Sequence, residues 1–169
     1  MRKILLVILM LSMFLPCRMM FAEEHDSAKH HYLGRSYQVF DYGMSWDEAE
    51  AYCEKLGGHL VTIGSTTEQA FVKSLLAKGT RHVYWMGGQR IHSGNWEWIT
   101  REPFSYTQWA NGQPDFHGGK EAKLIMYRIP MTDSSYQSGD WDELQPSGEY
   151  EGHLFFGLGH TGFICEWES

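Results

Sequence analysis

The stretch SWDEAEAYCEKLGGHLVTIGSTTEQAFVKSLLAKG, residues 45–79, predicts two consecutive helices, each with its own start signal. Ser45 and Glu48 have the spacing of a capping box, in which each side chain accepts a hydrogen bond from the other residue's backbone N–H. Ser65 and Glu68 repeat that spacing twenty positions later. The stretch therefore favours two short helices, close together in the chain.

Each predicted helix has one apolar face and a glycine stop. Apolar side chains recur three and four positions apart, as expected for the buried side of a helix. Glycine just after such a pattern is a frequent helix terminator. The expected buried faces are Trp46, Ala49, Cys53 and Leu56 in the first helix and Phe71, Val72, Leu75 and Leu76 in the second, with stops at Gly57-Gly58 and Gly79.

The rest of the chain favours strands. Short runs rich in aromatic and β-branched residues are typical of strands. They occur at 37–40, 83–87, 96–99, 124–127, 141–144 and 163–167. Between them, 100–123 and 128–140 are long and irregular, and long loops in compact domains are usually functional. One strand, two helices and then several strands predict an α+β fold, with the helices segregated from an antiparallel sheet.

The N-terminus has the features of a secretory signal. Met1-Arg2-Lys3 is basic, 4–16 is an apolar run of 13 residues, and Ala22 is a plausible cleavage point. The run is short for a membrane span. We therefore expect a signal peptide at 1–22, with an uncleaved anchor as the alternative, followed by a polar leader at 23–31. An exported protein is extracellular, or periplasmic in a bacterium.

Composition and charge limit the classes of partner that this protein is expected to bind. The chain has 169 residues, enough for one domain with a core, and its formal net charge is −7. Removal of 1–22 takes away Arg2, Lys3 and Arg18 and no acid, which lowers the charge to −10. Such an acidic domain is a poor nucleic-acid binder and a reasonable host for cations. The oligomeric state is not predicted.

Two cysteines remain after the signal. In an exported protein, Cys53 and Cys165 are most simply a disulfide. The alternative is a pair of buried free thiols.

The stretch WANGQPDFHGGKEAKL, residues 109–124, is either an ordinary surface loop or a set of oxygen ligands for a metal. Gln113 offers an amide oxygen, and Asp115 and Glu121 offer carboxylates. Calcium takes six to eight such oxygens.

Several motifs, in this order, resemble those of the C-type lectin-like domain, and the resemblance covers nearly all of 37–167. Any one of them is weak, but their joint order is specific. They are Cys53 in the first helix, Trp85-Met86-Gly87-Gly88, Trp96-Glu97-Trp98, Trp109, Gln113-Pro114-Asp115, Gly139-Asp140-Trp141-Asp142-Glu143 and Phe163-Ile164-Cys165-Glu166.

The resemblance implies a fold and a pairing. The fold would be a C-type lectin-like domain over 32–169, with two helices packed on small antiparallel sheets and a long ligand-binding loop region. Cys165 would pair with Cys53, and the bond before Pro114 would be cis. Core positions are implied for most of the seven tryptophans, and we expect core packing for all of them in preference to sugar stacking.

The resemblance also implies a calcium-dependent carbohydrate-binding site. The calcium ligands would be Gln113, Asp115, Glu121, Asp142 and Glu143. The Gln-Pro-Asp order resembles galactose-type sites, in which an aromatic ring tends to lie against the sugar. The sugar contacts would be Gln113, Asp115, Glu121, Asp142, Phe116 and His117, with ordinary loop packing as the alternative for Phe116.

Three departures from the family pattern bear on this site. Asp142-Glu143 stands where the family has Asn-Asp, which keeps the oxygens but removes an amide donor. A second disulfide that usually brackets the loop is absent, with Lys123 and Pro146 at its positions. Residues 146–160 look like an insertion. The alternative function is therefore a calcium-independent lectin-like domain that binds a protein or a surface, since a fold alone does not decide.

Enzymatic activity is not expected. The chain has nine histidines but no His-Glu-x-x-His arrangement, and it has neither a Gly-x-Ser-x-Gly elbow nor a phosphate loop. Asp140 and Asp142 suggest a carboxylate pair, but they alternate on a predicted strand beside a binding motif.

Overall fold

The computed structural model describes residues 28–91, 94–115, 122–129, 136–148 and 157–168. The chain divides into two compact units, 1–30 and 31–169, and the fold below is that of the second. The expected signal peptide and most of the leader lie outside the described residues. No helix in the described ranges is long and apolar enough to cross a membrane.

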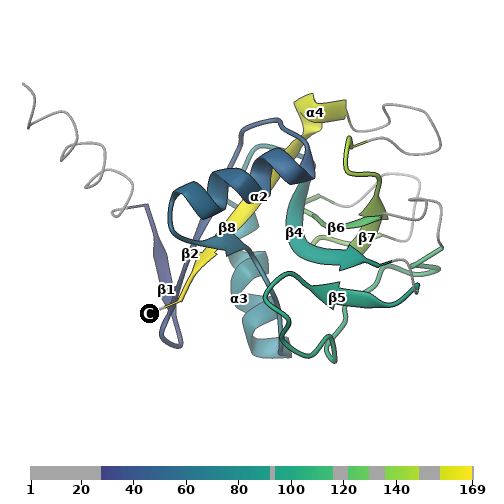
Figure 1. Cartoon of the computed structure of the whole chain (residues 1–169), viewed down its shortest axis with the longest axis horizontal. Coiled ribbons are helices and arrows are strands. Elements are labelled where there is room, and N and C mark those ends of the chain that lie inside the picture. The colour runs from purple at the N-terminus through teal and green to yellow at the C-terminus, as the bar shows by residue number, and fades with distance from the viewer. Residues whose placement is uncertain (1–27, 92–93, 116–121, 130–135, 149–156, 169) are drawn as a thin grey trace, which may run out of the picture. The chain divides into compact units, whose positions relative to one another are not determined.

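Strands and helices follow one another much as the sequence predicts (Figure 1). All six predicted strands and both predicted helices are present. A two-residue strand between the helices, a short N-terminal strand and a one-turn helix were not predicted. The elements are β1 His30–Tyr32, β2 Arg35–Phe40, α2 Trp46–Lys55, β3 His59–Leu60, α3 Thr66–Leu76, β4 Val83–Arg90, β5 Trp96–Trp98, β6 Lys123–Tyr127, β7 Trp141–Leu144, α4 Gly157–His160 and β8 Thr161–Trp167.

The first capping box is confirmed. Ser45 Oγ accepts from the N–H of Glu48 at 3.3 Å, and Glu48 Oε2 accepts from the N–H of Ser45 at 2.9 Å. The helix ends where Gly57 takes a φ of +80°, a conformation that glycine adopts without the steric cost of a side chain.

The second capping box forms only by half. Ser65 Oγ accepts from the N–H of Glu68 at 3.2 Å, as predicted. The Glu68 carboxylate, however, turns inward and accepts from the N–H of Gly64 at 2.8 Å and from the Tyr37 hydroxyl at 2.7 Å. A buried tyrosine hydroxyl on β2 thus competes for the carboxylate that the sequence assigns to the cap.

One continuous mixed sheet replaces the predicted small antiparallel sheets. The strand order is β1-β2-β8-β4-β6-β7, with β3 paired to β8 and β5 paired to β4. β4 and β8 run parallel, with Val83 opposite Thr161 and Trp85 opposite Phe163. Strand patterning shows which residues are buried but not the direction of a distant neighbour, so this parallel pair was not predictable.

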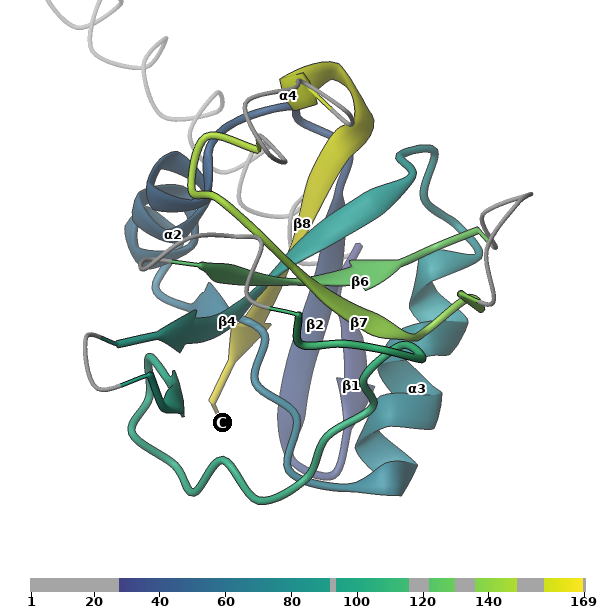
Figure 2. The same ribbon diagram turned by 90° about the vertical axis from the view of Figure 1, so that its right-hand side faces the viewer.

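The two helices cover opposite faces of the sheet (Figure 2). Trp46, Ala49 and Cys53 of α2 lie in one core cluster. Val72, Leu75 and Leu76 of α3 lie in the other. Leu56 and Phe71, both predicted to be buried, are only partly buried and pack at the margins of these clusters.

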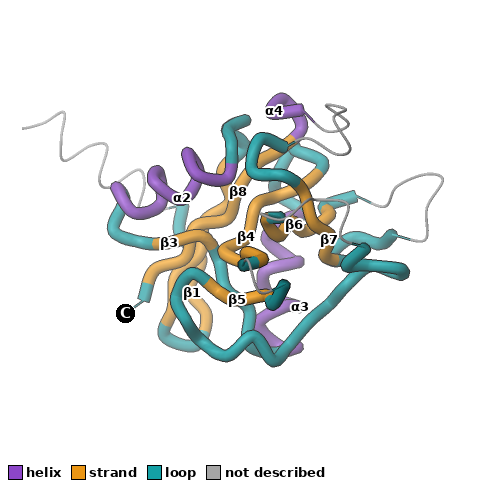
Figure 3. Tube along the Cα trace, turned by 45° about the vertical axis from the view of Figure 1, so that its right-hand side comes forward, coloured by secondary structure: helices purple, strands orange, loops and turns teal. Residues whose placement is uncertain are grey.

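The tryptophans are mostly core residues, as expected. Five are buried: Trp46, Trp85, Trp98, Trp141 and Trp167. Trp96 and Trp109 are partly buried and pack against the α3-side cluster. The segment that follows β5 runs mainly as loop (Figure 3), and it brings Trp109 back to the sheet, where it bridges to Trp141 of β7.

Candidate functional site: the Gln113–Asp115 loop and β7

The Gln-Pro-Asp triplet forms a compact polar turn. The bond between Gln113 and Pro114 is cis, as the resemblance implies. The side-chain oxygen of Gln113 accepts from the N–H of Asp115 at 2.9 Å, and its amide lies 3.5 Å from an Asp115 carboxylate oxygen. The two side chains therefore lie together on one side of the proline.

Backbone bonds fasten this loop to β7. The N–H of Ala110 donates to the carbonyl of Trp141 at 2.9 Å, and the N–H of Trp141 donates to the carbonyl of Gln108 at 2.8 Å. These bonds join the two halves of the predicted site. The loop is thus held by main-chain pairing to the strand that carries Asp142.

Two tyrosines that the sequence analysis missed support the site residues. The Gln113 amide donates to the Tyr136 hydroxyl at 2.9 Å, and the Tyr127 hydroxyl donates to Asp142 Oδ2 at 2.5 Å. The two rings lie against each other with centroids 5.2 Å apart. Tyr127 could have been found from its place in the β6 pattern, two residues after Ile125, which pairs with Asp142. Tyr136 lies in an irregular segment that gives no such signal.

Asp142 is almost fully buried, and its surroundings disfavour its charge. Burial raises its pKa to about 6, and the nearby negative charges of Asp115 and Glu143 act in the same direction. Hydrogen bonds from the Tyr127 hydroxyl and from the N–H of Glu143 oppose the shift. A bound cation would remove this penalty, because it favours the ionised carboxylate.

Asp142 and Glu143 point to opposite faces of β7. Successive strand residues alternate, and the pairing agrees: Asp142 lies opposite Ile125 of the α2-side cluster, and Glu143 opposite Leu124 of the α3-side cluster. Both carboxylates are buried. Among the described residues, the predicted ligands whose side chains share one neighbourhood are Gln113, Asp115 and Asp142.

The predicted site is only partly within the described residues. Glu121, Phe116 and His117 lie outside them. Among the described residues, the group of His, Cys, Asp and Glu side chains whose ligand atoms all lie within 4.8 Å of one another is a different one, His59, Glu166 and Glu168. The ligand atoms present at the loop are one amide oxygen and several carboxylate oxygens, and these are the oxygens that calcium binds.

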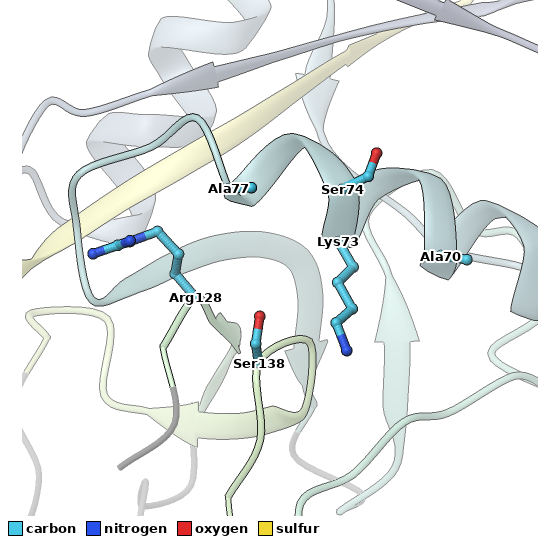
Figure 4. Close-up of a pocket in the computed structure, with 6 residues that line it drawn as sticks. All are labelled: Ala70, Lys73, Ser74, Ala77, Arg128 and Ser138. Carbon is cyan, nitrogen blue, oxygen red and sulfur yellow. The ribbon is translucent and has the colours of Figure 1, made fainter. Parts of the chain in front are cut away.

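A pocket of about 400 Å³ lies elsewhere, between α3 and the segment around Ser138 (Figure 4). Its lining includes Lys73 and Arg128 but none of the predicted ligand residues. The side chains of Lys73 and Arg128 point away from each other, so they do not converge on one ligand group.

The predicted disulfide is not formed in this structure. Cys53 and Cys165 are both free and fully buried, and they lie in the same core cluster. A hydrogen bond between the two thiols is the largest cause of a raised pKa at Cys53, with burial next. The fold thus brings the pair together as predicted, but as thiols.

Comparison with known proteins gives the family. The model of the lectin C-type domain matches residues 42–145. The galactose-specific lectin nattectin of Thalassophryne nattereri is 36% identical over 90 residues, which are 52% of this chain and 57% of nattectin. Perlucin of Haliotis laevigata is 35% identical over 86 residues, 50% of this chain and 56% of perlucin. The chain thus spans little more than half the length of these two relatives.

Solved structures agree on the fold. The C-type carbohydrate-recognition domain of cow CD23 superimposes with a TM-score of 0.63 at 24% identity, over 84% of this chain and 94% of that domain. A calcium-independent type II antifreeze protein gives 0.64 at 23% identity, over 84% and 92%. C-type lectin domains are carbohydrate-binding modules without enzymatic activity. The chain belongs to the C-type lectin domain family.

Proposed function

We propose that this chain is a secreted, calcium-dependent carbohydrate-binding protein, with galactose-type sugars as the favoured ligands. The observation that carries the proposal is the Gln113–Asp115 turn, closed by a hydrogen bond from the N–H of Asp115 to the Gln113 side chain. Main-chain bonds hold this turn beside the buried Asp142 of β7. This is a polar, partly exposed group of oxygens on a rigid base, as a ligand site requires.

Calcium would be held by Gln113, Asp115 and Asp142, with Glu121 from the same loop. Glu143, the fifth residue of the expected set, is left out because its side chain points to the other face of β7. When bound, the ion supplies a positive centre that accepts the oxygens of a ligand. The protein's own contribution is to keep Asp142 out of water and close to Asp115, so that the negative charges there favour a cation over an empty site.

A sugar would present two neighbouring hydroxyls to the ion and to the same side chains. Gln113, Asp115, Glu121 and Asp142 would exchange hydrogen bonds with those hydroxyls, and Phe116 and His117 would lie against the apolar face of the ring. Nattectin, a relative with 36% identity, is named as galactose-specific. Both this relationship and the Gln-Pro-Asp order support a galactose-type ligand.

The second candidate is calcium-independent binding of a protein or a surface. Its support is that polar groups of the site already bond one another: Gln113 to Tyr136, and Asp142 to Tyr127. A domain that is similar in fold is a calcium-independent antifreeze protein. Nucleic acid is not a candidate, because the chain is acidic.

Thermal unfolding with and without calcium separates the two candidates. A ligand that binds only the folded state stabilises it, by about 2.7 kcal/mol at one hundred times its Kd. We expect the unfolding midpoint to rise in millimolar calcium and to return with chelator. An unchanged midpoint removes the first candidate. Asp47→Asn, which alters an exposed carboxylate on α2, is the matched control for Asp115→Asn.

A glycan array tests the ligand class. We expect galactose-terminated glycans to be retained in calcium and lost in chelator. The double variant Gln113→Glu with Asp115→Asn exchanges the donor and acceptor side chains of the triplet, and we expect it to shift retention toward mannose. Retention that is equal in calcium and chelator would support the second candidate.

Secretion rests on the N-terminal pattern. If 1–22 is a cleaved signal, protein recovered from the medium begins at Glu23. Recovery only in membranes, with an intact N-terminus, would support the uncleaved anchor.

A further inference from the structure

A second group of charged side chains lies on β2, β8 and β3, away from the ligand loop in the strand order. Antiparallel pairing places His59 of β3 opposite Glu166 of β8, and Tyr37 of β2 opposite the same Glu166. Glu168 follows two residues after Glu166 and therefore extends the same face. The three strands run side by side near the C-terminus (Figures 1 and 3).

Three of these side chains converge. His59, Glu166 and Glu168 each offer a ligand atom, and these atoms all lie within 4.8 Å of one another. His59 Nε2 is 3.8 Å from Glu168 Oε1, which is beyond hydrogen-bond distance. Glu166 is fully buried and Glu168 is half exposed, so one ligand is fixed by the core and the other is free to adjust.

The imidazole of His59 is oriented as metal-binding histidines are. Its Nδ1 lies 2.9 Å from the carbonyl oxygen of Leu60, which accepts hydrogen bonds only, so Nδ1 carries the proton. On the neutral ring, Nε2 then keeps its lone pair. That nitrogen is buried and has no hydrogen-bond partner. A backbone carbonyl that fixes the tautomer, with the other nitrogen aimed at carboxylates, is the usual outer-shell arrangement around a ligating histidine.

The group has an excess of negative charge. Among the described residues, Arg35 is the arginine at this group, and it lies within 4.0 Å of four carboxylates. The shortest of these contacts are 2.6 Å to Glu102 and 2.9 Å to Glu166. These carboxylates outnumber the one guanidinium beside them. A divalent cation would offset this excess of negative charge. The carboxylates are those of Glu68, Glu102, Glu166 and Glu168.

We propose that His59, Glu166 and Glu168 form a binding site for a divalent transition-metal cation such as zinc, separate from the calcium site of the loop. One imidazole nitrogen and two carboxylate oxygens are a ligand set that zinc takes, whereas calcium prefers oxygen alone. The proposal does not depend on the proposed function, because no residue is shared between the two sites.

The geometry requires a small closure. Zinc binds nitrogen and oxygen at about 2.0–2.2 Å, so tetrahedral ligand atoms lie about 3.4 Å apart. Glu166 is held in place by the N–H of Thr62, which donates to Oε2 at 2.9 Å. Glu168 is the residue that would move, exchanging part of its 3.2 Å contact with Arg35 for the metal.

Zinc titration of the purified chain by calorimetry, with excess calcium present throughout, tests the site. We expect one zinc equivalent to bind, His59→Gln to weaken it at least tenfold, and Glu168→Gln to weaken it severalfold. The half-exposed Glu168 is the safeguard if His59→Gln fails to fold. His31→Gln is the matched control, because this exposed imidazole, bonded to Ser36, lies outside the group.

Each outcome is informative. Zinc binding that His31→Gln abolishes and His59→Gln spares would place the metal at His31 and overturn the proposal. The proposal would also be overturned if zinc did not bind, or if the excess calcium in the titration prevented zinc from binding. Calcium-dependent glycan retention should be unchanged in His59→Gln, so failure here and failure at the loop are distinguishable.

Discussion

At β7, the buried Asp142 lies near Asp115 and Glu143, which add negative charge, whereas at β8 the equally buried Glu166 lies 2.9 Å from Arg35. Both carboxylates are removed from water, and burial raises the pKa of each, to about 6 for Asp142 and about 7 for Glu166. Their partners differ: a tyrosine hydroxyl for Asp142 and a guanidinium for Glu166. Neighbouring side chains, rather than burial alone, therefore decide whether a buried carboxylate is paired with a cationic side chain.

This difference predicts different responses of the two groups to substitution and to calcium. Arg35 ties β2 to α3 and β8 through Glu68 and Glu166, so its ion pairs join elements of the fold. Asp142 is tied to Tyr127 of the neighbouring strand, and its charge is left for an added cation to stabilise. We expect the first group to affect stability most and the second to respond most to calcium.

The largest effect is expected for Arg35→Ala. Removing one partner of a buried ion pair leaves an uncompensated charge and typically costs about 3–5 kcal/mol. We expect the free energy of unfolding, measured with urea, to fall by about 3 kcal/mol. This is the lower end of the range, because Arg35 is partly exposed and Glu166 can take up a proton. Arg101→Ala, at an exposed arginine on a loop, is the control. A change below about 1 kcal/mol would mean that Arg35 does not hold these elements together.

The next largest effect is expected for Tyr127→Phe. The change removes the hydroxyl that donates to Asp142 at 2.5 Å inside the core. A hydrogen bond to a charged group contributes about 1.5–3 kcal/mol. We expect a loss of that size without calcium and a smaller loss with calcium, since the ion replaces part of the lost stabilisation. Equal losses in both conditions would argue against Asp142 as a calcium ligand.

Asp142→Asn is expected to stabilise the calcium-free protein. The folded pKa of Asp142, about 6, lies above its ordinary value of 3.8, so the folded state binds this proton more readily than the unfolded state. The contribution of Asp142 to the stability of the folded state is therefore lost as pH rises through 6 and is regained toward pH 4. The shift corresponds to at most about 3 kcal/mol at pH 7.

Denaturation of Asp142→Asn and wild type at pH 7 and pH 4.5 measures this effect. We expect a gain of about 1–2 kcal/mol for the variant at pH 7 that shrinks at pH 4.5, while calcium affinity falls. Asp47→Asn, which changes an exposed carboxylate on α2, is the control variant. A variant that is less stable than wild type at pH 7 would contradict the electrostatic account of the site.

The smallest effect is expected for Tyr136→Phe. Its hydroxyl accepts from the Gln113 amide at 2.9 Å in a half-buried position. Such a neutral hydrogen bond contributes about 0.5–1.5 kcal/mol. We expect a stability loss near the lower figure, and a gain in calcium affinity if the released Gln113 turns toward the ion. Calorimetry with calcium measures the second quantity, and a marked loss of affinity would show that Tyr136 positions Gln113 for the metal.

Local patterns in the sequence were enough to predict most elements and much of the core. The capping box at Ser45 and the apolar spacing of α2 and α3 depend on residues within one or two turns, so they are visible in the chain itself. The cis bond before Pro114 and the family were likewise predictable from short motifs. Asp115 and Asp142 were identified from such motifs and are brought into one neighbourhood by the loop's pairing to β7.

The tertiary structure alone decided features that depend on residues far apart in the chain. The parallel pairing of β4 with β8, the inward turn of Glu68 and the roles of Tyr127 and Tyr136 arise from packing across the sheet. The same holds for the meeting of His59 with Glu166, more than 100 residues later. Sequence spacing determines which residues are neighbours along one helix or strand. Contacts between distant strands form only when the whole core assembles, because apolar surface is removed from water only when the strands and helices pack together.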